Sequence, residues 1–193
     1  MSKVNFQQLK LVASGIRMHG NGFIQLNLPN NSRLHVWPEH PVGQQKVYTG
    51  WHNHKFSFNS RVICGTLLHK QFDLVQDNDG KYNLYTAVVR DKEDTELVLY
   101  TDQRYSLSNT QQFNMAAGSQ YTFNKGMFHE SQGVGLTATI MTKTESDDTI
   151  KPIVLCPIYQ KPDNDFNRYQ LSEEVLWENV EKVFNLVGDI YLP

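Results

Sequence analysis

The pattern of apolar and polar residues divides the chain into a short helical segment, a long strand-rich segment and a final helix. Residues 4–13 place their apolar side chains on one side of a helix. From about residue 22, apolar and polar residues alternate with the period of a β-strand. Residues 23–28 and 33–37 predict two strands joined by a turn at Asn30 and Asn31. The chain therefore begins with one short helix and continues into a sheet.

Residues 46–145 predict a series of short strands rich in tyrosine, phenylalanine, valine and threonine. Residues 82–89 and 96–100 predict a hairpin. Turn signals separate the strands at 77–80, 91–94, 117–118 and 133–135. Many short strands without intervening helices predict a sandwich or barrel rather than alternating strands and helices.

The last part of the chain predicts an amphipathic helix over residues 172–187. Ser172 is its expected N-cap, the acidic first turn suits the helix dipole, and Gly188 ends it. An apolar stripe on such a helix most often packs on its own domain, and a homodimer contact is the alternative. Residues 1–193 are expected to form a single domain, with the barrel over about 20–158.

Composition excludes several classes of protein. The formal net charge is -2 and no block of basic residues occurs, so we expect no nucleic-acid partner. No run approaches the roughly 20 apolar residues that cross a bilayer, and the first residues lack the apolar core of a signal peptide. Two cysteines are too few for a disulfide framework. These observations predict a cytoplasmic protein that does not bind membranes.

A His-x-His pair is the first candidate for chemistry. On an extended strand, residues two apart point to the same face, so His52 and His54 project together. Two imidazoles on one face can hold one ion, because histidine is a common ligand of zinc, iron, nickel and copper. The pair by itself is a weak signal, since strand histidines are ordinary.

A second segment makes the signal specific. Residues 118–129 read as a strand, a tight turn at Gly126 and His129 directly after the turn. Together with His52, His54 and a following glycine at position 65, this segment resembles the paired motifs of the cupin superfamily. The resemblance implies an all-β, cupin-type jelly-roll barrel flanked by the two helices. It also implies that His52, His54 and His129 bind one divalent metal ion.

The glutamate of the first cupin motif is replaced by Phe58 here, which leaves three imidazoles and no carboxylate. That pattern is most similar to the three-histidine branch that includes cysteine dioxygenase. The resemblance implies an Fe(II) site, with zinc or nickel as alternatives, and a dioxygenase that acts on a small, thiol-like molecule. A non-catalytic barrel that sequesters or senses a small-molecule ligand is the alternative, and a relic barrel without metal is the third reading.

Four residues are candidates for binding the substrate. Arg33 and His35 share one face of a predicted strand with Trp37. If that face points inward, Arg33 can hold a carboxylate or phosphate. The favoured reading is that Arg33 is exposed and Trp37 fills the barrel, because arginine is mostly exposed. Strand parity places Phe58 on the face of the histidines, and Tyr121 could reach the same cavity.

The remaining histidines and one cysteine complete the predictions. His19, His40 and His69 lie outside the motif pattern and are expected at the surface. Cys64 shares the inward parity of the histidine pair and is expected to be a small buried apolar group.

Overall fold

The computed structural model describes residues 2–45, 50–89, 95–162, 164 and 166–193. The predicted turn at 91–94 lies outside the described residues. The elements in chain order are β1 (Ser2–Val4), α1 (Phe6–Val12), β2 (Ile16–Met18), β3 (Ile24–Leu28), β4 (Ser32–Trp37), β5 (Phe56–Gln76), β6 (Tyr82–Val89), β7 (Thr95–Ala116), β8 (Gln120–Phe123), β9 (Phe128–Ser146), β10 (Ile153–Pro157), α2 (Glu173–Val187) and β11 (Ile190–Leu192).

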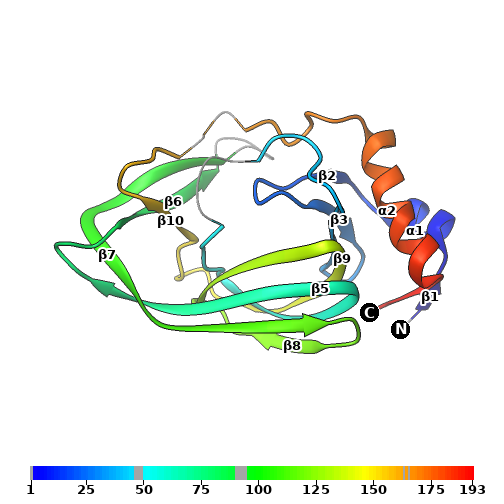
Figure 1. The fold of residues 1–193 in the computed structure, drawn as a ribbon, viewed down its shortest axis with the longest axis horizontal. Coiled ribbons are helices and arrows are strands. Elements are labelled where there is room, and N and C mark those ends of the chain that lie inside the picture. Colours follow the sequence, from blue (N-terminus) through cyan, green and yellow to red (C-terminus); the bar gives the residue numbers. More distant parts are fainter. Residues whose placement is uncertain (1, 46–49, 90–94, 163, 165) are drawn as a thin grey trace.

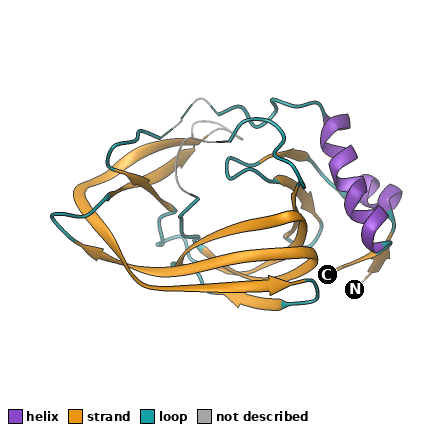
Figure 2. Ribbon diagram, in the orientation of Figure 1, coloured by secondary structure: helices purple, strands orange, loops and turns teal. Residues whose placement is uncertain are grey.

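One antiparallel sheet makes up most of the structure. Its nine strands follow the order β10-β6-β7-β5-β9-β4-β3-β2, and β8 pairs with β5 outside this path. The sheet curls into a half-barrel, with both helices together at one end (Figures 1 and 2). The short strands β1 and β11 pair with each other and bring the two termini side by side. The predicted all-β class with an N-terminal and a C-terminal helix is confirmed.

The strands in the middle of the chain are longer than the sequence predicts. β5, β7 and β9 contain 21, 22 and 19 residues. The glycine-containing segment 133–135 lies inside β9 and does not separate two strands. Glycine marks an irregular position in a strand as readily as a turn, which is why the prediction of short strands was wrong here. The predicted hairpin between β6 and β7 is confirmed.

The curled sheet has two different faces. On β4, Leu34 and Val36 are fully buried against the helices, whereas Arg33, His35 and Trp37 point into the half-barrel and line its cavity. The largest apolar core of the chain therefore lies outside the barrel, between the sheet and the helices. The cavity on the concave face is lined mainly by polar and aromatic side chains.

Helix α2 packs on its own chain. Ser172 is its N-cap and Gly188 its C-cap, as predicted. Leu176, Val180 and Val183 are almost completely buried against the sheet, which is the reading that the sequence favours. Neither helix of the described residues has the length and apolar character that a bilayer crossing requires. The homodimer contact stays a prediction.

Replacing Leu176 with alanine should lower the free energy of unfolding by about 3 kcal/mol, because a buried leucine leaves a cavity when it is truncated. Leu176 is 1% exposed, whereas Leu186 on the same helix is 63% exposed and serves as the matched control. Urea denaturation of both variants measures the difference. Equal losses in the two variants would contradict the assignment of the packed face.

A bulge in β5 changes which side chains face the cavity. Val62 pairs with Thr139, but Cys64 pairs with Ala138, so β5 carries one extra residue at this point. Gly65 follows with a φ of 72°, a conformation that favours glycine. A Cβ atom at Gly65 would lie 2.4 Å from the carbonyl oxygen of Leu136, so the bulge also needs glycine for space.

The bulge overturns two predictions. Cys64 was expected to face inward, but it packs in the helix-side core with Ala138. His69 was expected at the surface, but its exposed fraction is 0% and its ring lies inside the half-barrel beside His129. The Cys64 prediction continued the strand alternation across the bulge, where the extra residue exchanges the two faces. The His69 prediction rested only on its place outside the motif pattern.

Candidate metal centre

The His-x-His pair lies on an extended segment between two strand edges and not within a regular strand. His52 exchanges two backbone hydrogen bonds with His129, at 3.0 and 2.9 Å. On the other side, the Ile153 N–H donates to the Asn53 side-chain oxygen at 2.7 Å, and the Asn53 N–H donates to the Ile153 carbonyl. The Gly126 N–H donates to the His54 carbonyl at 2.8 Å. These bonds hold the segment from β9, β10 and the turn that precedes β9.

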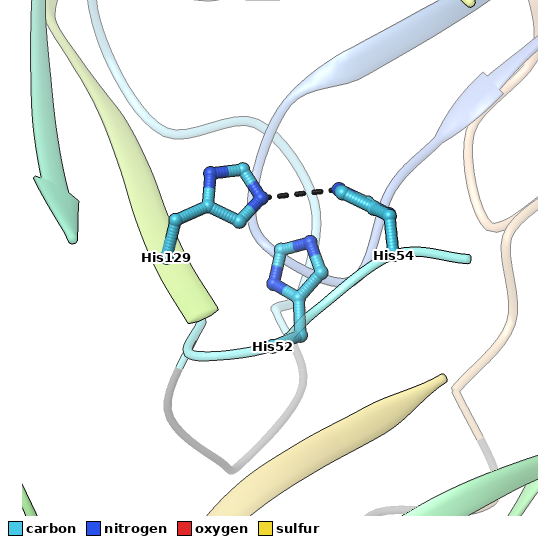
Figure 3. Close-up of side chains that lie close together, drawn as sticks. All are labelled: His52, His54 and His129. Atoms are coloured by element: carbon cyan, nitrogen blue, oxygen red, sulfur yellow. Dashed lines mark hydrogen bonds between the residues drawn. The ribbon is translucent and has the colours of Figure 1, made fainter. Parts of the chain in front are cut away.

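The three histidines meet inside the half-barrel. His129 is the second residue of β9, and its ring faces those of His52 and His54 (Figure 3). The centroid of the His52 ring lies 4.7 Å from the centroids of both other rings. The Nε2 atoms of His54 and His129 are 3.0 Å apart. One ligand atom from each histidine can be chosen so that all three lie within 4.8 Å of one another. The structure thus brings the three predicted ligands together.

The hydrogen bond of His52 and the separation of the His54 and His129 nitrogens are compatible with a bound metal ion. His52 Nδ1 lies 2.6 Å from the Gly50 carbonyl oxygen, which accepts a hydrogen bond from the Nδ1–H and so leaves the Nε2 lone pair directed at the cluster. Two nitrogen ligands at right angles around an ion with bonds of about 2.1 Å lie about 3 Å apart, which matches the His54–His129 separation. Three neutral imidazoles are a donor set that suits zinc, iron, copper and nickel.

Burial keeps the three imidazoles neutral. Desolvation lowers the pKa of His52, and it lowers the pKa values of His54 and His129 well below their usual range. The neighbouring histidines lower the pKa values of His54 and His129 further. Neutral imidazole is the form that binds a metal, so the cluster is in its ligand form at neutral pH.

Aromatic rings surround the cluster where a carboxylate would stand in the usual cupin motif. Phe58 is 4% exposed, and its ring lies 5.7 Å from that of His54 and 6.0 Å from that of His129. Phe56 stacks on His54 at 4.7 Å, and Phe123 lies 4.3 Å from His129. The described part of the chain therefore offers three nitrogen ligands and no carboxylate in this group.

The cavity beside the cluster contains all four residues predicted to bind substrate. It is lined by Arg33, His35, Phe58 and Tyr121 together with the three histidines. No aspartate or glutamate of the described residues lines it. Burial, Arg17 and Arg168 lower the pKa of Arg33 to about 10, so its guanidinium stays charged at neutral pH. Of the two readings of Arg33, the inward one is what the structure shows.

Sequence reasoning missed two histidines that face the cavity or its ligands. His69 Nδ1 forms a hydrogen bond of 2.9 Å with the hydroxyl of Ser131. The His69 ring lies beside that of the metal-ligand candidate His129, with centroids 5.1 Å apart. His19 lines the cavity and stacks on Phe23, with ring centroids 4.3 Å apart. His40 is exposed, as expected. No signal in the sequence pattern revealed the bulge that turns His69 inward, and His19 lies outside the strands, where parity gives no signal either.

Comparisons with known proteins give weak structural likenesses only. No protein-family model and no curated protein matches the chain. Among solved structures, CENP-C of Drosophila melanogaster is 9% identical, with a TM-score of 0.37 over 72% of this chain and 90% of that one.

Two further solved structures match with similarly low identities and TM-scores. A cupin-2 domain protein of Shewanella frigidimarina is 18% identical, with a TM-score of 0.27 over 60% of this chain and 72% of that one. Hydroquinone 1,2-dioxygenase of Sphingomonas is 8% identical, with a TM-score of 0.31 over 63% of this chain and 64% of that one.

Proposed function

We propose that this chain is a metal-dependent cupin in which His52, His54 and His129 bind one divalent ion. The observation that carries the proposal is the convergence of three neutral imidazoles, one buried and two half-buried, from two distant parts of the chain. Three inward imidazoles without an ion are buried polar groups that need other partners. The Nε2 atoms of His54 and His129 are hydrogen-bonded to each other at 3.0 Å, and one ion would replace that bond with a partner shared by all three rings.

The finer proposal is a mononuclear non-haem iron dioxygenase that acts on a small, thiol-like molecule. The donor set supports it, since three ligands on one side of an ion leave positions open for substrate and dioxygen. The protein's own contribution is positioning: Arg33 and His35 hold the polar end of the substrate, Tyr121 donates a hydrogen bond, and Phe58 packs on its apolar part. Burial raises the pKa of Tyr121, so its hydroxyl keeps its proton.

Elemental analysis of freshly purified protein tests the metal site. We expect one equivalent of a divalent transition metal in the wild type and less than a tenth of an equivalent in His129→Ala, because the variant loses one of three ligands. His40→Ala is the matched control, since His40 is exposed and far from the motif pattern. An unchanged metal content in His129→Ala would refute the assigned site.

Oxygen consumption then separates an enzyme from a binder. Iron-loaded wild-type protein should consume dioxygen in the presence of a small thiol, and His129→Ala should not. Stoichiometric metal without turnover of any thiol in a panel would favour the alternative, a barrel that binds and senses a small molecule without converting it.

A further inference from the structure

Three nitrogen donors stand in a row on the inner face of β4. Arg33, His35 and Trp37 occupy alternate positions of the strand, about 7 Å apart along it, and all three line the cavity. Their backbone places are fixed by pairing with Met141, Thr139 and Thr137 of β9. The row is therefore part of the rigid sheet.

The donors on this row lack protein partners. The Nε2 atom of His35 and the Nε1 atom of Trp37 are buried and have no hydrogen-bond acceptor among the described residues. Arg33 forms no ion pair with any described carboxylate, and none lines the cavity. Trp37 is only 7% exposed. Buried donors almost always find an acceptor, so the two neighbouring ones on His35 and Trp37, beside the partly buried guanidinium of Arg33, predict an acceptor that enters the cavity.

The rings on this row are held in place. Phe23 packs between the two side chains, with its ring 4.7 Å from His35 and 4.9 Å from Trp37. Gly133 lies directly behind the indole, where a Cβ atom would come within 2.5 Å of Trp37. Side chains fixed in this way pay little conformational entropy when they bind, which suits a preorganised binding site.

The chemistry of the row defines the ligand. A guanidinium in a cavity without acidic side chains selects an anion, and its planar fork fits a carboxylate. Neutral imidazole and indole N–H groups select a second oxygen acceptor farther along the strand. We propose that the inner face of β4 binds a small carboxylate carrying a second oxygen acceptor, with Arg33 on the carboxylate and His35 and Trp37 on the second oxygen.

This inference rests on the proposed function only in placing the ligand in the same cavity as the metal centre, and it does not need the ion. The chain has three tryptophans, so an ¹⁵N-labelled sample shows three indole N–H signals, and Trp37→Phe identifies that of Trp37. The probe is 4-oxopentanoate, a carboxylate with one carbonyl oxygen. Pentanoate lacks the carbonyl oxygen, and 2-pentanone lacks the carboxylate.

We expect 4-oxopentanoate to shift the Trp37 indole signal and to leave that of Trp177 on α2 in place. Arg33→Gln should raise the dissociation constant at least about tenfold, because a hydrogen bond to a charged group is lost. Pentanoate should bind at least about threefold more weakly than 4-oxopentanoate to the wild type. In Trp37→Phe, which keeps an aromatic ring in the row but has no Trp37 signal, titration calorimetry should show a smaller difference between the affinities of the two acids.

The outcomes separate this inference from the metal site. A Trp37 signal that does not respond to 4-oxopentanoate, or equal affinities of the wild type and Arg33→Gln, would overturn it. The titration is repeated with a chelator and in His129→Ala. A retained Trp37 response in a chain that holds no metal would support the β4 site while the proposed metal function fails. Stoichiometric metal without any Trp37 response would support the metal site while the proposed β4 site fails.

Discussion

Lowering the pH from 7 to 5 should cost the chelator-treated protein at least about 4 kcal/mol of unfolding free energy. Burial and the charge of Arg33 lower the pKa of His35 from 6.5 to about 3, and burial and His52 lower the pKa of His69 to about 4. In the unfolded chain both imidazoles take up a proton near pH 6.5. Each therefore favours unfolding by about 2 kcal/mol at pH 5.

The direction of this effect follows from where each state binds protons. Because the folded-state pKa values are depressed, the unfolded state binds more protons below pH 6.5, and stability falls as the pH falls towards 4 and then 3. His54 and His129, whose pKa values are also lowered, add to the loss in the same direction. Bound metal should steepen it, since protons compete with the ion for the same nitrogens.

Urea denaturation at a series of pH values measures this dependence. His35→Phe removes one of the two titrating groups and should reduce the loss between pH 7 and 5 by about 2 kcal/mol. His40→Ala, at an exposed position, should leave the wild-type profile unchanged. A stability that stays flat between pH 7 and 5 would show that these imidazoles are not buried in their neutral form.

Replacing Phe123 with alanine should lower the free energy of unfolding by about 4 kcal/mol and weaken metal binding as well. Phe123 is 1% exposed and is the largest fully buried side chain of the described residues. Its ring contacts those of His129, Phe58 and His69 at centroid distances of 4.3, 5.3 and 5.4 Å. Truncating a buried phenylalanine leaves a large cavity, and this one would lie directly against a candidate ligand.

Phe113 provides the matched control for this variant, because it lies on β7 with 40% of its surface exposed. Phe113→Ala should change the unfolding free energy by less than about 1 kcal/mol. Denaturation and elemental analysis are run on both variants. A Phe123→Ala protein with wild-type stability and metal content would show that the ring neither fills the barrel nor positions His129.

The local elements could be predicted from the sequence because each depends on neighbouring residues. The turn at Asn30 and Asn31, where both residues have positive φ, joins β3 to β4 as expected. The caps at Ser172 and Gly188 bound helix α2. The three metal-ligand candidates were also predictable, since their spacing in two motifs is a property of the chain itself, and the fold brings them within 4.8 Å.

Which face of the sheet points where was decided by the tertiary structure. Alternation along β4 predicts two faces, but it does not tell which one the helices cover. The helices cover Leu34 and Val36, which leaves Arg33 and His35 inside.

The bulge near Gly65 is the second feature that the pattern of the sequence did not reveal. It exchanges the faces of β5, so that Cys64 joins the helix-side core and His69 enters the barrel. Side chains alternate between the two faces only while the pairing of the strand is regular. One extra residue therefore exchanges the faces of the side chains that follow it. The sequence by itself therefore determined the all-β class, the two helices and the metal-ligand candidates. The tertiary structure decided the length of β5, β7 and β9, and the helix layer and the bulge decided which other side chains surround the candidates.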